Sequence, residues 1–208
     1  MNNDINKLLI KDVTKVFKIG GRMLGSRLVA VNKANFQIAE EKPEILTLAG
    51  ESGSGKTTLA RMILGLTEPS YGSINYMDRD IAHIKRKKDK LWFMSHIQPV
   101  FQNPFESFNP LKKVSLYLFE TAKKFRHTKS IKETREVVAE GLSAIGLSLE
   151  EVEDRYPNEF SGGQLQRISI ARALISQSKI LVADEPVSMV DASLRMSIIN
   201  LFLKLKEE

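Results

Sequence analysis

The sequence predicts an α/β fold with a largely parallel core sheet, an N-terminal antiparallel β-subdomain and an inserted α-helical subdomain. Three observations support this fold class. A short apolar run at residues 45–49 precedes a glycine-rich turn and then apolar residues at helical spacing. A second apolar run, at residues 180–183, ends in two carboxylates. Between the two runs, helical patterns occupy most of residues 104–165.

Composition limits the classes of protein to which the chain can belong. Its 208 residues, of which 42% are hydrophobic, are enough for one compact core with an inserted subdomain. The absence of cysteine excludes disulfides, thiolate zinc sites and cysteine nucleophiles. No apolar run approaches the roughly 20 residues that cross a bilayer. The N-terminus, Met-Asn-Asn-Asp, is mostly polar and does not resemble a secretory signal, so we expect an intracellular protein that is at most peripheral to a membrane.

The net charge is +6, and the densest basic cluster lies at residues 85–90, which Trp92 and Phe93 follow. We expect a solvated loop there, with a basic edge near lipid headgroups as the alternative. No motif that reads nucleic acid accompanies the charge, so we do not expect a nucleic-acid partner.

The N-terminal third has the pattern of a small antiparallel sheet. Apolar residues alternate with polar ones over residues 8–17, and residues 29–38 contain two short strand-like pieces. A glycine-rich loop is expected at residues 20–25, and a turn with a short strand at residues 71–76. The run at residues 45–49 is expected to be a buried strand that leads into the glycine-rich turn.

The rest of the chain alternates strands with helices. A short strand is expected at residues 97–101, followed by helices over residues 115–124 and 130–145, the second of which stops at Gly146. Another helix opens at Ser161 and turns Leu165, Ile168, Ala171 and Leu174 inward, and a last one opens at Asp191 with Leu194, Ile198, Leu201 and Leu205 inward. The domain boundaries follow: residues 1–103 form the core and β-subdomain, 104–165 the helical subdomain, and 166–208 continue the core, with its C-terminal part missing.

The glycine-rich turn fits the pattern G-x-x-x-x-G-K-[ST], which binds phosphate when a strand precedes it and a helix follows. Its glycines allow backbone N–H groups to point inward, and the helix that follows adds the positive end of its dipole. Lys56 would reach the β- and γ-phosphates, and the Thr57 hydroxyl would bind Mg²⁺. The expected nucleotide contacts are Gly50, Glu51, Ser52, Gly53, Ser54, Gly55, Lys56, Thr57 and Thr58.

Two further motifs have both a chemical and a purely structural interpretation. Asp184 and Glu185 follow a predicted strand, where Asp184 would bind the metal and Glu185 would polarise the attacking water. The alternative is a pair of exposed acids that begins a loop. Ser161 with Gln164 makes a capping box, which needs no ligand. The intervening Gly162 and Gly163 favour an anion site at the helix N-terminus instead, and a second anion site in one chain suggests that it serves the nucleotide of another molecule.

In order and spacing, these motifs resemble those of ATP-binding cassette (ABC) ATPases over about residues 8–195. The matching segments are the glycine-rich turn, Val-Phe-Gln at residues 100–102, Phe-Ser-Gly-Gly-Gln at 160–164 and Ile-Leu-Val-Ala-Asp-Glu at 180–185. The resemblance implies a P-loop NTPase core, ATP and Mg²⁺ as cofactors, and a head-to-tail dimer. In that dimer each ATP lies between the glycine-rich turn of one chain (residues 50–57, called the Lys56 turn below) and Ser161 of the other.

The resemblance also implies roles for single residues. Glu185, Lys56 and Gln102 would be catalytic, and Thr57, Gln102 and Asp184 would hold Mg²⁺. Asp191 would lie at the dimer interface beside the nucleotide. Phe17 would stack on adenine, although a core strand residue is an equally good interpretation.

Within the family, residues 100–110, 155–161 and 186–193 resemble the ATPase subunits of oligopeptide and dipeptide importers. Such a subunit is peripheral, at the cytoplasmic face of the cell membrane. Its partners are a second ATPase chain, identical or paralogous, membrane-spanning permease subunits and, indirectly, an extracytoplasmic solute-binding protein. Related importers carry nickel or oligosaccharides, and the sequence does not name the cargo.

The chain departs from the family pattern in one respect. It ends at Glu208, before the position at which the family places a histidine that contacts the γ-phosphate. We therefore expect a truncated subunit that binds ATP and hydrolyses it poorly. Two other classes remain open: soluble ABC ATPases of translation, repair or iron–sulfur assembly, and P-loop kinases, which leave residues 161–164 unexplained.

Overall fold

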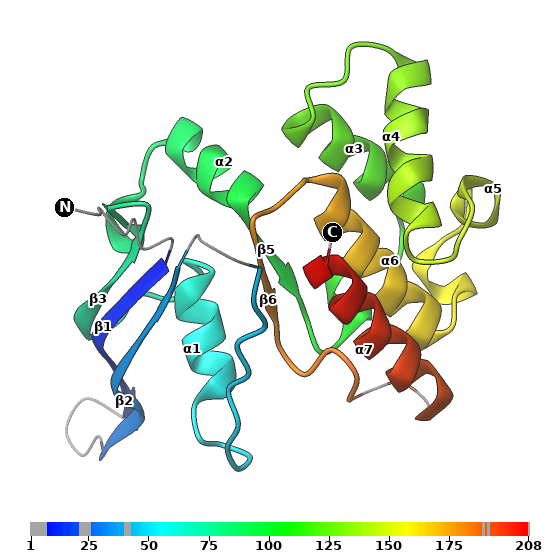
Figure 1. The fold of residues 1–208 in the computed structure, drawn as a ribbon. Helices are drawn as coiled ribbons and strands as arrows, with labels where there is room; N and C mark the ends of the chain where they lie inside the picture. Colours follow the sequence, from blue (N-terminus) through cyan, green and yellow to red (C-terminus); the bar gives the residue numbers. More distant parts are fainter. Residues whose placement is uncertain (1–7, 21–25, 40–42, 189, 191, 208) are drawn as a thin grey trace. The chain divides into compact units, whose positions relative to one another are not determined.

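The computed structural model describes residues 8–20, 26–39, 43–188, 190 and 192–207 (Figure 1). The chain forms two compact units, Met1–Lys90 and Leu91–Glu208. The boundary between them, after Lys90, does not coincide with either predicted domain boundary, at residue 103 or at residue 165, and the three-part division stays a proposal.

The first unit contains the antiparallel sheet that the sequence predicts. Its strands are β1 (Leu8–Ile19), β2 (Ser26–Ile38), β3 (Tyr71–Tyr76) and β4 (Arg79–Asp80). They lie in the order β2-β1-β3-β4, and every neighbouring pair is antiparallel.

The two strand-like pieces expected over residues 29–38 are one continuous strand, so this detail of the prediction is wrong. The reason is a set of register shifts between β1 and β2, where Asp12 and Lys33 adopt left-handed backbone angles, with φ of +49° and +47°. An extra residue in a strand turns the following side chains to the opposite face. Leu8 and Ile10 are buried two residues apart, but the next buried residue, Val13, comes three later.

The buried strand expected at residues 45–49 is absent, and that prediction is wrong. Ile45, Leu46 and Leu48 expose 50%, 48% and 41% of their surface. An apolar run becomes a strand only where a neighbouring strand completes its backbone hydrogen bonds, and no described residue does so for this segment. Apolar composition alone is therefore not enough to predict a strand at residues 45–49.

Helix α1 (Lys56–Ile63) follows the glycine-rich turn as predicted and buries Leu59, Met62 and Ile63. After the short helix η1 (Ile81–His83) comes α2 (Lys87–His96), which contains most of the basic cluster. The loop expected over residues 85–90 is therefore wrong for residues 87–90, which form the start of α2, because Lys is a good helix former and Phe93 supplies a buried apolar contact. The lysines themselves are exposed, as expected.

The second unit contains a parallel strand pair and most of the helices (Figure 1). Strands β5 (Ile97–Val100) and β6 (Ile180–Ala183) pair in register, with Ile97 opposite Ile180 and Val100 opposite Ala183. The apolar run at residues 180–183 predicts a buried strand; the strand is present, but only Ile180 of its four residues is buried, so the predicted burial is wrong in part. The helices are α3 (Val114–Phe125), α4 (Ile131–Ser143), α5 (Leu149–Val152), α6 (Gly162–Ile175) and α7 (Ala192–Glu207), with short turns η2 (Pro104–Ser107) and η3 (Pro157–Glu159).

The predicted start of α4 and its glycine stop are confirmed, although the helix ends at Ser143, two residues before the predicted residue 145. Ser130 caps the helix by accepting a hydrogen bond from the Glu133 N–H at 3.1 Å. Gly146 terminates it with φ of +70°, and the Leu147 N–H donates to the Leu142 carbonyl at 3.0 Å.

Helix α6 is the centre of the second unit. Leu165, Ile168 and Ala171 are completely buried, whereas Leu174 lies half-buried at the edge of the core. Leu118 of α3 and Val138 of α4 pack in the same cluster as α6, and α7 contributes its own buried residue there. Figure 1 shows α3, α4 and α7 gathered around α6.

The packing around α6 is tested by Ile168→Val, which removes one buried methylene. We expect the free energy of unfolding to fall by about 1 kcal/mol, because the cavity left in a close-packed core has no atoms to fill it. The matched control is Ile131→Val, since Ile131 is 78% exposed. Urea unfolding followed by circular dichroism measures both, and equal losses would contradict the central place of α6.

Candidate nucleotide site

The glycine-rich turn has the geometry that phosphate binding requires. Gly53 and Gly55 have φ of +80° and +91°, which L-residues rarely adopt. The Ser54 N–H donates to the Glu51 carbonyl at 3.2 Å, and the Leu59 N–H donates to the Gly55 carbonyl at 2.8 Å, where α1 begins. The turn thus delivers the first N–H groups of α1, which have no partner within the helix, beside the turn's own backbone.

Gly55 also meets a constraint that the sequence does not show. A Cβ at this position would lie 2.0 Å from the Ala30 carbonyl oxygen of β2. The turn therefore packs backbone against backbone on the antiparallel sheet, and only glycine fits.

We expect Gly55→Ala to destabilise the first unit by about 1–3 kcal/mol, because the new methyl group collides with β2 at a strained φ. Gly53→Ala is the matched control, since it shares the positive φ but a Cβ there meets nothing within 4 Å. Thermal unfolding of both variants separates the collision from the backbone strain. Identical midpoints would show that the contact with Ala30 is unimportant.

Lys56 lies over the turn rather than in solvent. Its Nζ donates to the carbonyl oxygens of Gly50 and Glu51, at 2.8 Å and 2.7 Å. Phosphate oxygens are charged and so are stronger acceptors than these carbonyls. Thr57 and Thr58 occupy the next positions of α1, with Thr57 exposed and Thr58 half-buried.

Phe17 is not a core residue, which corrects one of its two interpretations. Its side chain is 39% exposed, opposite Leu28 in the β1–β2 register. The Lys15 ammonium lies 5.2 Å from the centre of the ring. A ring on an open sheet surface leaves adenine stacking as a proposal.

In the second unit, the structure brings Gln102 and Glu185 together. Parallel strands end at the same edge of a sheet, so the residues after Val100 of β5 and Ala183 of β6 become neighbours. The Asp184 N–H donates to the Val100 carbonyl at 3.0 Å, and the Gln102 amide Nε2 donates to Glu185 Oε2 at 3.0 Å.

Glu185 has an unusual backbone conformation. Its φ is +44°, in the left-handed region that a residue with a side chain occupies only at a cost. Ser188 holds this turn, since its N–H and Oγ both donate to the Glu185 carbonyl, at 3.1 Å and 2.9 Å. Strained residues of this kind cluster at functional sites.

The donor set suits a hard cation such as Mg²⁺. Asp184 offers carboxylate oxygens, and Gln102 keeps its amide oxygen as an acceptor while its nitrogen bonds Glu185. Across the part of the chain that the structure describes, no three His, Asp or Glu side chains cluster as metal ligands. Mg²⁺ is commonly bound by one or two protein groups together with substrate phosphates, so such a cluster is not needed.

At the start of α6, the capping box is present. Ser161 Oγ accepts the Gln164 N–H at 3.2 Å, and Gln164 Oε1 accepts the Ser161 N–H at 3.0 Å. Gly162 is half-buried and Gly163 is buried. An anion site at this helix start, served by Ser161, stays a proposal.

The predicted site residues are divided between the units. The turn of residues 50–58 and Phe17 lie in the first unit, whereas Gln102, Asp184, Glu185 and residues 161–164 lie in the second. Asp191 lies outside the described residues. The assembly of one nucleotide site from both units is therefore a proposal.

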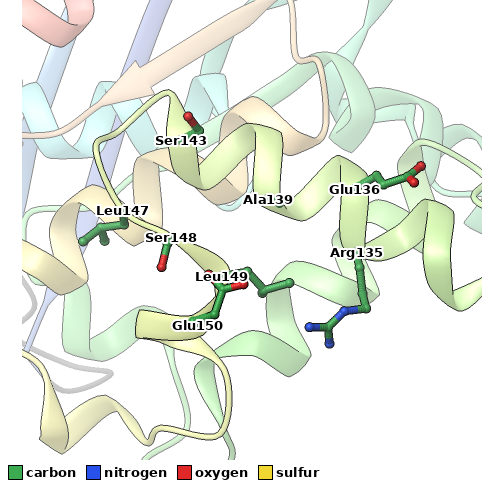
Figure 2. A pocket seen from close by; sticks show the side chains of 8 residues that line it. All are labelled: Arg135, Glu136, Ala139, Ser143, Leu147, Ser148, Leu149 and Glu150. Atoms are coloured by element: carbon green, nitrogen blue, oxygen red, sulfur yellow. The ribbon is translucent and has the colours of Figure 1, made fainter.

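A groove of about 380 Å³ lies elsewhere, between α4 and the start of α5 (Figure 2). None of the predicted site residues lines it. Arg135 at its rim is paired with Glu153, at 2.9 Å between Nη2 and Oε2, and two more carboxylates, of Glu136 and Glu150, stand on its walls. These charges do not favour a nucleotide there.

The buried side chain of Gln166 is a possible functional residue that the sequence motifs do not predict. Gln166 lies on the apolar side of α6, beside Leu165, and contacts the backbone next to Gln102. A glutamine among residues at core spacing was the available signal.

None of the helices in the described part of the chain is long and apolar enough to span a membrane.

Comparison with known proteins places the chain in a family. The sequence profile described as "ABC transporter" matches residues 31–188. Dimeric ATP-binding cassette MJ0796, solved in a post-hydrolysis state bound to ADP and Pi, superposes with a TM-score of 0.82 at 29% identity, covering 96% of this chain and 83% of that one. This superposition confirms the predicted α/β fold of an ABC ATPase.

Curated relatives are similar in sequence as well. The oligopeptide transport ATP-binding protein OppF of Streptococcus pyogenes serotype M1 is 40% identical over 96% of this chain and 62% of its own length. AppF of Bacillus subtilis, also an oligopeptide transport ATP-binding protein, is 38% identical over 97% of this chain and 61% of its own. The dipeptide transport ATP-binding protein DppF of Haemophilus influenzae is 41% identical over 86% and 53%. The chain thus spans less than two thirds of the length of these relatives, and by profile, sequence and fold it belongs to the ABC transporter family.

Proposed function

We propose that the chain is the ATP-binding and ATP-hydrolysing subunit of a membrane importer. The observation that carries this proposal is the hydrogen bond from Gln102 to Glu185 at the ends of β5 and β6, in a chain whose other unit carries the Lys56 turn. A carboxylate held by an amide at the carboxyl ends of parallel strands is suited to orienting a water molecule for attack on phosphorus.

Binding of ATP begins at the turn. Backbone N–H groups around Gly53 and Gly55 surround the phosphates, and the N-terminus of α1 adds its dipole. Lys56 transfers its hydrogen bonds from the Gly50 and Glu51 carbonyls to phosphate oxygens, where its charge is better neutralised. Thr57, Gln102 and Asp184 would hold Mg²⁺, which when bound neutralises charge on the phosphates.

Hydrolysis depends on the second unit. Glu185 accepts a hydrogen bond from the attacking water and draws electron density onto the water oxygen. Gln102 fixes the direction of the Glu185 carboxylate through its 3.0 Å bond. Lys56 then stabilises the charge that develops on the transferred phosphoryl group.

We further propose that two chains act head to tail. Ser161 begins a 14-residue helix, and the start of a helix attracts anions. Because the Lys56 turn of the same chain already binds one nucleotide, we infer that the anion site at Ser161 contacts the nucleotide bound to the partner chain. The dimeric state of the solved cassette, bound to ADP and Pi, supports this arrangement.

The cargo we propose is oligopeptides or dipeptides, because curated relatives near 40% identity are named for the transport of both. In this role the chain docks on membrane-spanning permease subunits at the cytoplasmic face, and a solute-binding protein outside delivers the peptide. Nickel and oligosaccharides are the alternative cargoes.

ATP hydrolysis is tested by phosphate release from ATP with Mg²⁺, followed by addition of EDTA. We expect release that stops when the metal is removed, because the phosphate charge is no longer neutralised. Release that continues at the same rate in excess EDTA would contradict the assigned role of Asp184 and Thr57.

The importer role is tested by affinity purification of the tagged chain from detergent-solubilised membranes. Membrane-spanning proteins of the permease type are expected among the proteins that co-purify. Recovery of ribosomal proteins in their place would favour a soluble ABC ATPase.

A further inference from the structure

We propose that Gln166 is a positioning residue for the catalytic pair, which consists of Gln102 and Glu185. It holds the backbone immediately before Gln102 and thereby fixes the direction in which Gln102 reaches Glu185. This inference rests on the proposed ATPase function and adds a residue to it.

Gln166 is a polar side chain in an apolar place. It lies on α6 between Leu165 and Ile168, and only 1% of its surface is exposed. Its Nε2 donates to the Phe101 carbonyl at 3.2 Å. Its Oε1 is buried and accepts no hydrogen bond from any described residue.

A buried amide with a hydrogen bond at its nitrogen and none at its oxygen stabilises the fold less than an apolar side chain of the same size. Leu or Met would fill the same volume without burying an unpaired oxygen. Among the described residues, the one hydrogen bond of the Gln166 side chain joins positions 65 residues apart, from the second turn of α6 to the segment after β5. The structural benefit of that bond is therefore local to Phe101.

The segment that Gln166 holds leads directly to the catalytic pair. The Val100 carbonyl accepts the Asp184 N–H at 3.0 Å, so β6 fixes one side of this backbone. Gln166 fixes the next carbonyl, at Phe101, from the side of α6. With both carbonyls held, the backbone of Gln102 has little freedom, and its amide meets Glu185 at 3.0 Å.

The same helix connects this contact with the proposed partner site. Ser161 caps α6, and Gln166 lies five residues further on, about 7.5 Å along the axis. A helix is rigid over this length, so a shift of its N-terminus moves Gln166 as well. In the proposed dimer, α6 thus links the nucleotide of the partner to the Gln102–Glu185 bond.

The first test is amide hydrogen exchange in the Gln166→Leu variant. We expect the amide of Asp184, which donates to the Val100 carbonyl next to the released Phe101 carbonyl, to exchange roughly three- to ten-fold faster, because the segment that it is bonded to is held less firmly. The matched control is Arg167→Met. Arg167 Nη1 also donates to a backbone carbonyl at 3.2 Å, but that carbonyl belongs to Ile145. This control should leave the exchange of the Asp184 amide unchanged and affect the peptide around residue 145.

The second test is steady-state hydrolysis. Gln166→Leu is expected to lower kcat roughly ten-fold and leave the KM for ATP unchanged, because the loss misplaces the catalytic pair and spares the Lys56 turn. Arg167→Met should retain the kcat of the parent chain. Circular dichroism melts show whether each variant is folded.

The third test uses Gln166→Glu, which keeps the shape of the side chain. Burial raises the pKa of the new carboxyl group. Below that pKa its O–H donates to the Phe101 carbonyl, as the amide did; above it, a carboxylate repels that carbonyl. Activity relative to the parent chain should therefore rise as the pH falls, whereas Gln166→Leu should show a constant ratio.

The outcomes separate this proposal from the one on which it rests. A parent chain that releases no phosphate overturns the proposed ATPase function, and the exchange of the Asp184 amide still decides whether Gln166 holds this segment. Unchanged exchange there in a folded Gln166→Leu variant overturns the positioning role. So does an equal loss of kcat in Gln166→Leu and Arg167→Met, which would indicate a general loss of packing.

Discussion

Glu185→Gln is expected to lower the rate of phosphate release by roughly 100- to 10,000-fold while ATP still binds. The amide keeps the shape of the carboxylate, and its oxygen still accepts the bond from Gln102. It carries no negative charge, however, and so draws no proton from the attacking water. ATP should then persist between two chains, so light scattering should show a dimer with ATP and a monomer with ADP.

The control for this variant is Glu136→Gln, an equivalent change at a mostly exposed glutamate on α4. It should leave both phosphate release and the nucleotide-dependent mass unchanged. Release at the rate of the parent chain by Glu185→Gln would contradict the catalytic role. A monomer with either nucleotide would contradict a homodimer and favour a partner chain of different sequence.

Lys56→Ala is expected to weaken ATP binding by roughly 100- to 1000-fold, because it removes charge-assisted hydrogen bonds to the phosphates. The affinity is measured with a fluorescent ATP analogue in the presence of Mg²⁺. A small loss of stability should accompany the change, since the Gly50 and Glu51 carbonyls lose their bonds to Nζ.

Arg61→Ala provides the matched control for Lys56. Arg61 is an exposed cation on the same helix, in the last turn of α1. Equal losses of affinity in the two variants would show that general charge attracts ATP, and the specific placement of Lys56 would then be wrong.

The turns and helix ends agree with the sequence-based predictions because each depends on residues only a few positions apart. The glycine pattern before Lys56 places a turn and a helix start, and both formed as expected. Ser130 marks the start of α4 and Gly146 follows its end, and the hydrogen bonds at both ends join residues only a few positions apart. The capping box at Ser161 was also visible, since its two partners are only three residues apart.

Errors arose where the outcome depended on distant partners. The apolar run at residues 45–49 has the composition of a strand, but composition does not supply the neighbour that completes a strand. The charge of the basic cluster at residues 85–90 favours a loop, but Lys also has a high helix propensity, and four of these six residues lie in α2. The two interpretations of Phe17 differ in how exposed its ring is, and this depends on the strand register, which shifts at bulges in β1.

By itself, the sequence determined the fold class, the family motifs and most helix boundaries, because each rests on residue types at short, fixed spacing. The tertiary structure alone decided that Gln102 reaches Glu185, that Gly55 packs on the Ala30 carbonyl and that Gln166 holds the Phe101 carbonyl. These contacts join residues 25 to 83 positions apart. Which distant segments meet depends on how strands and helices pack, and that information is not contained in any local pattern.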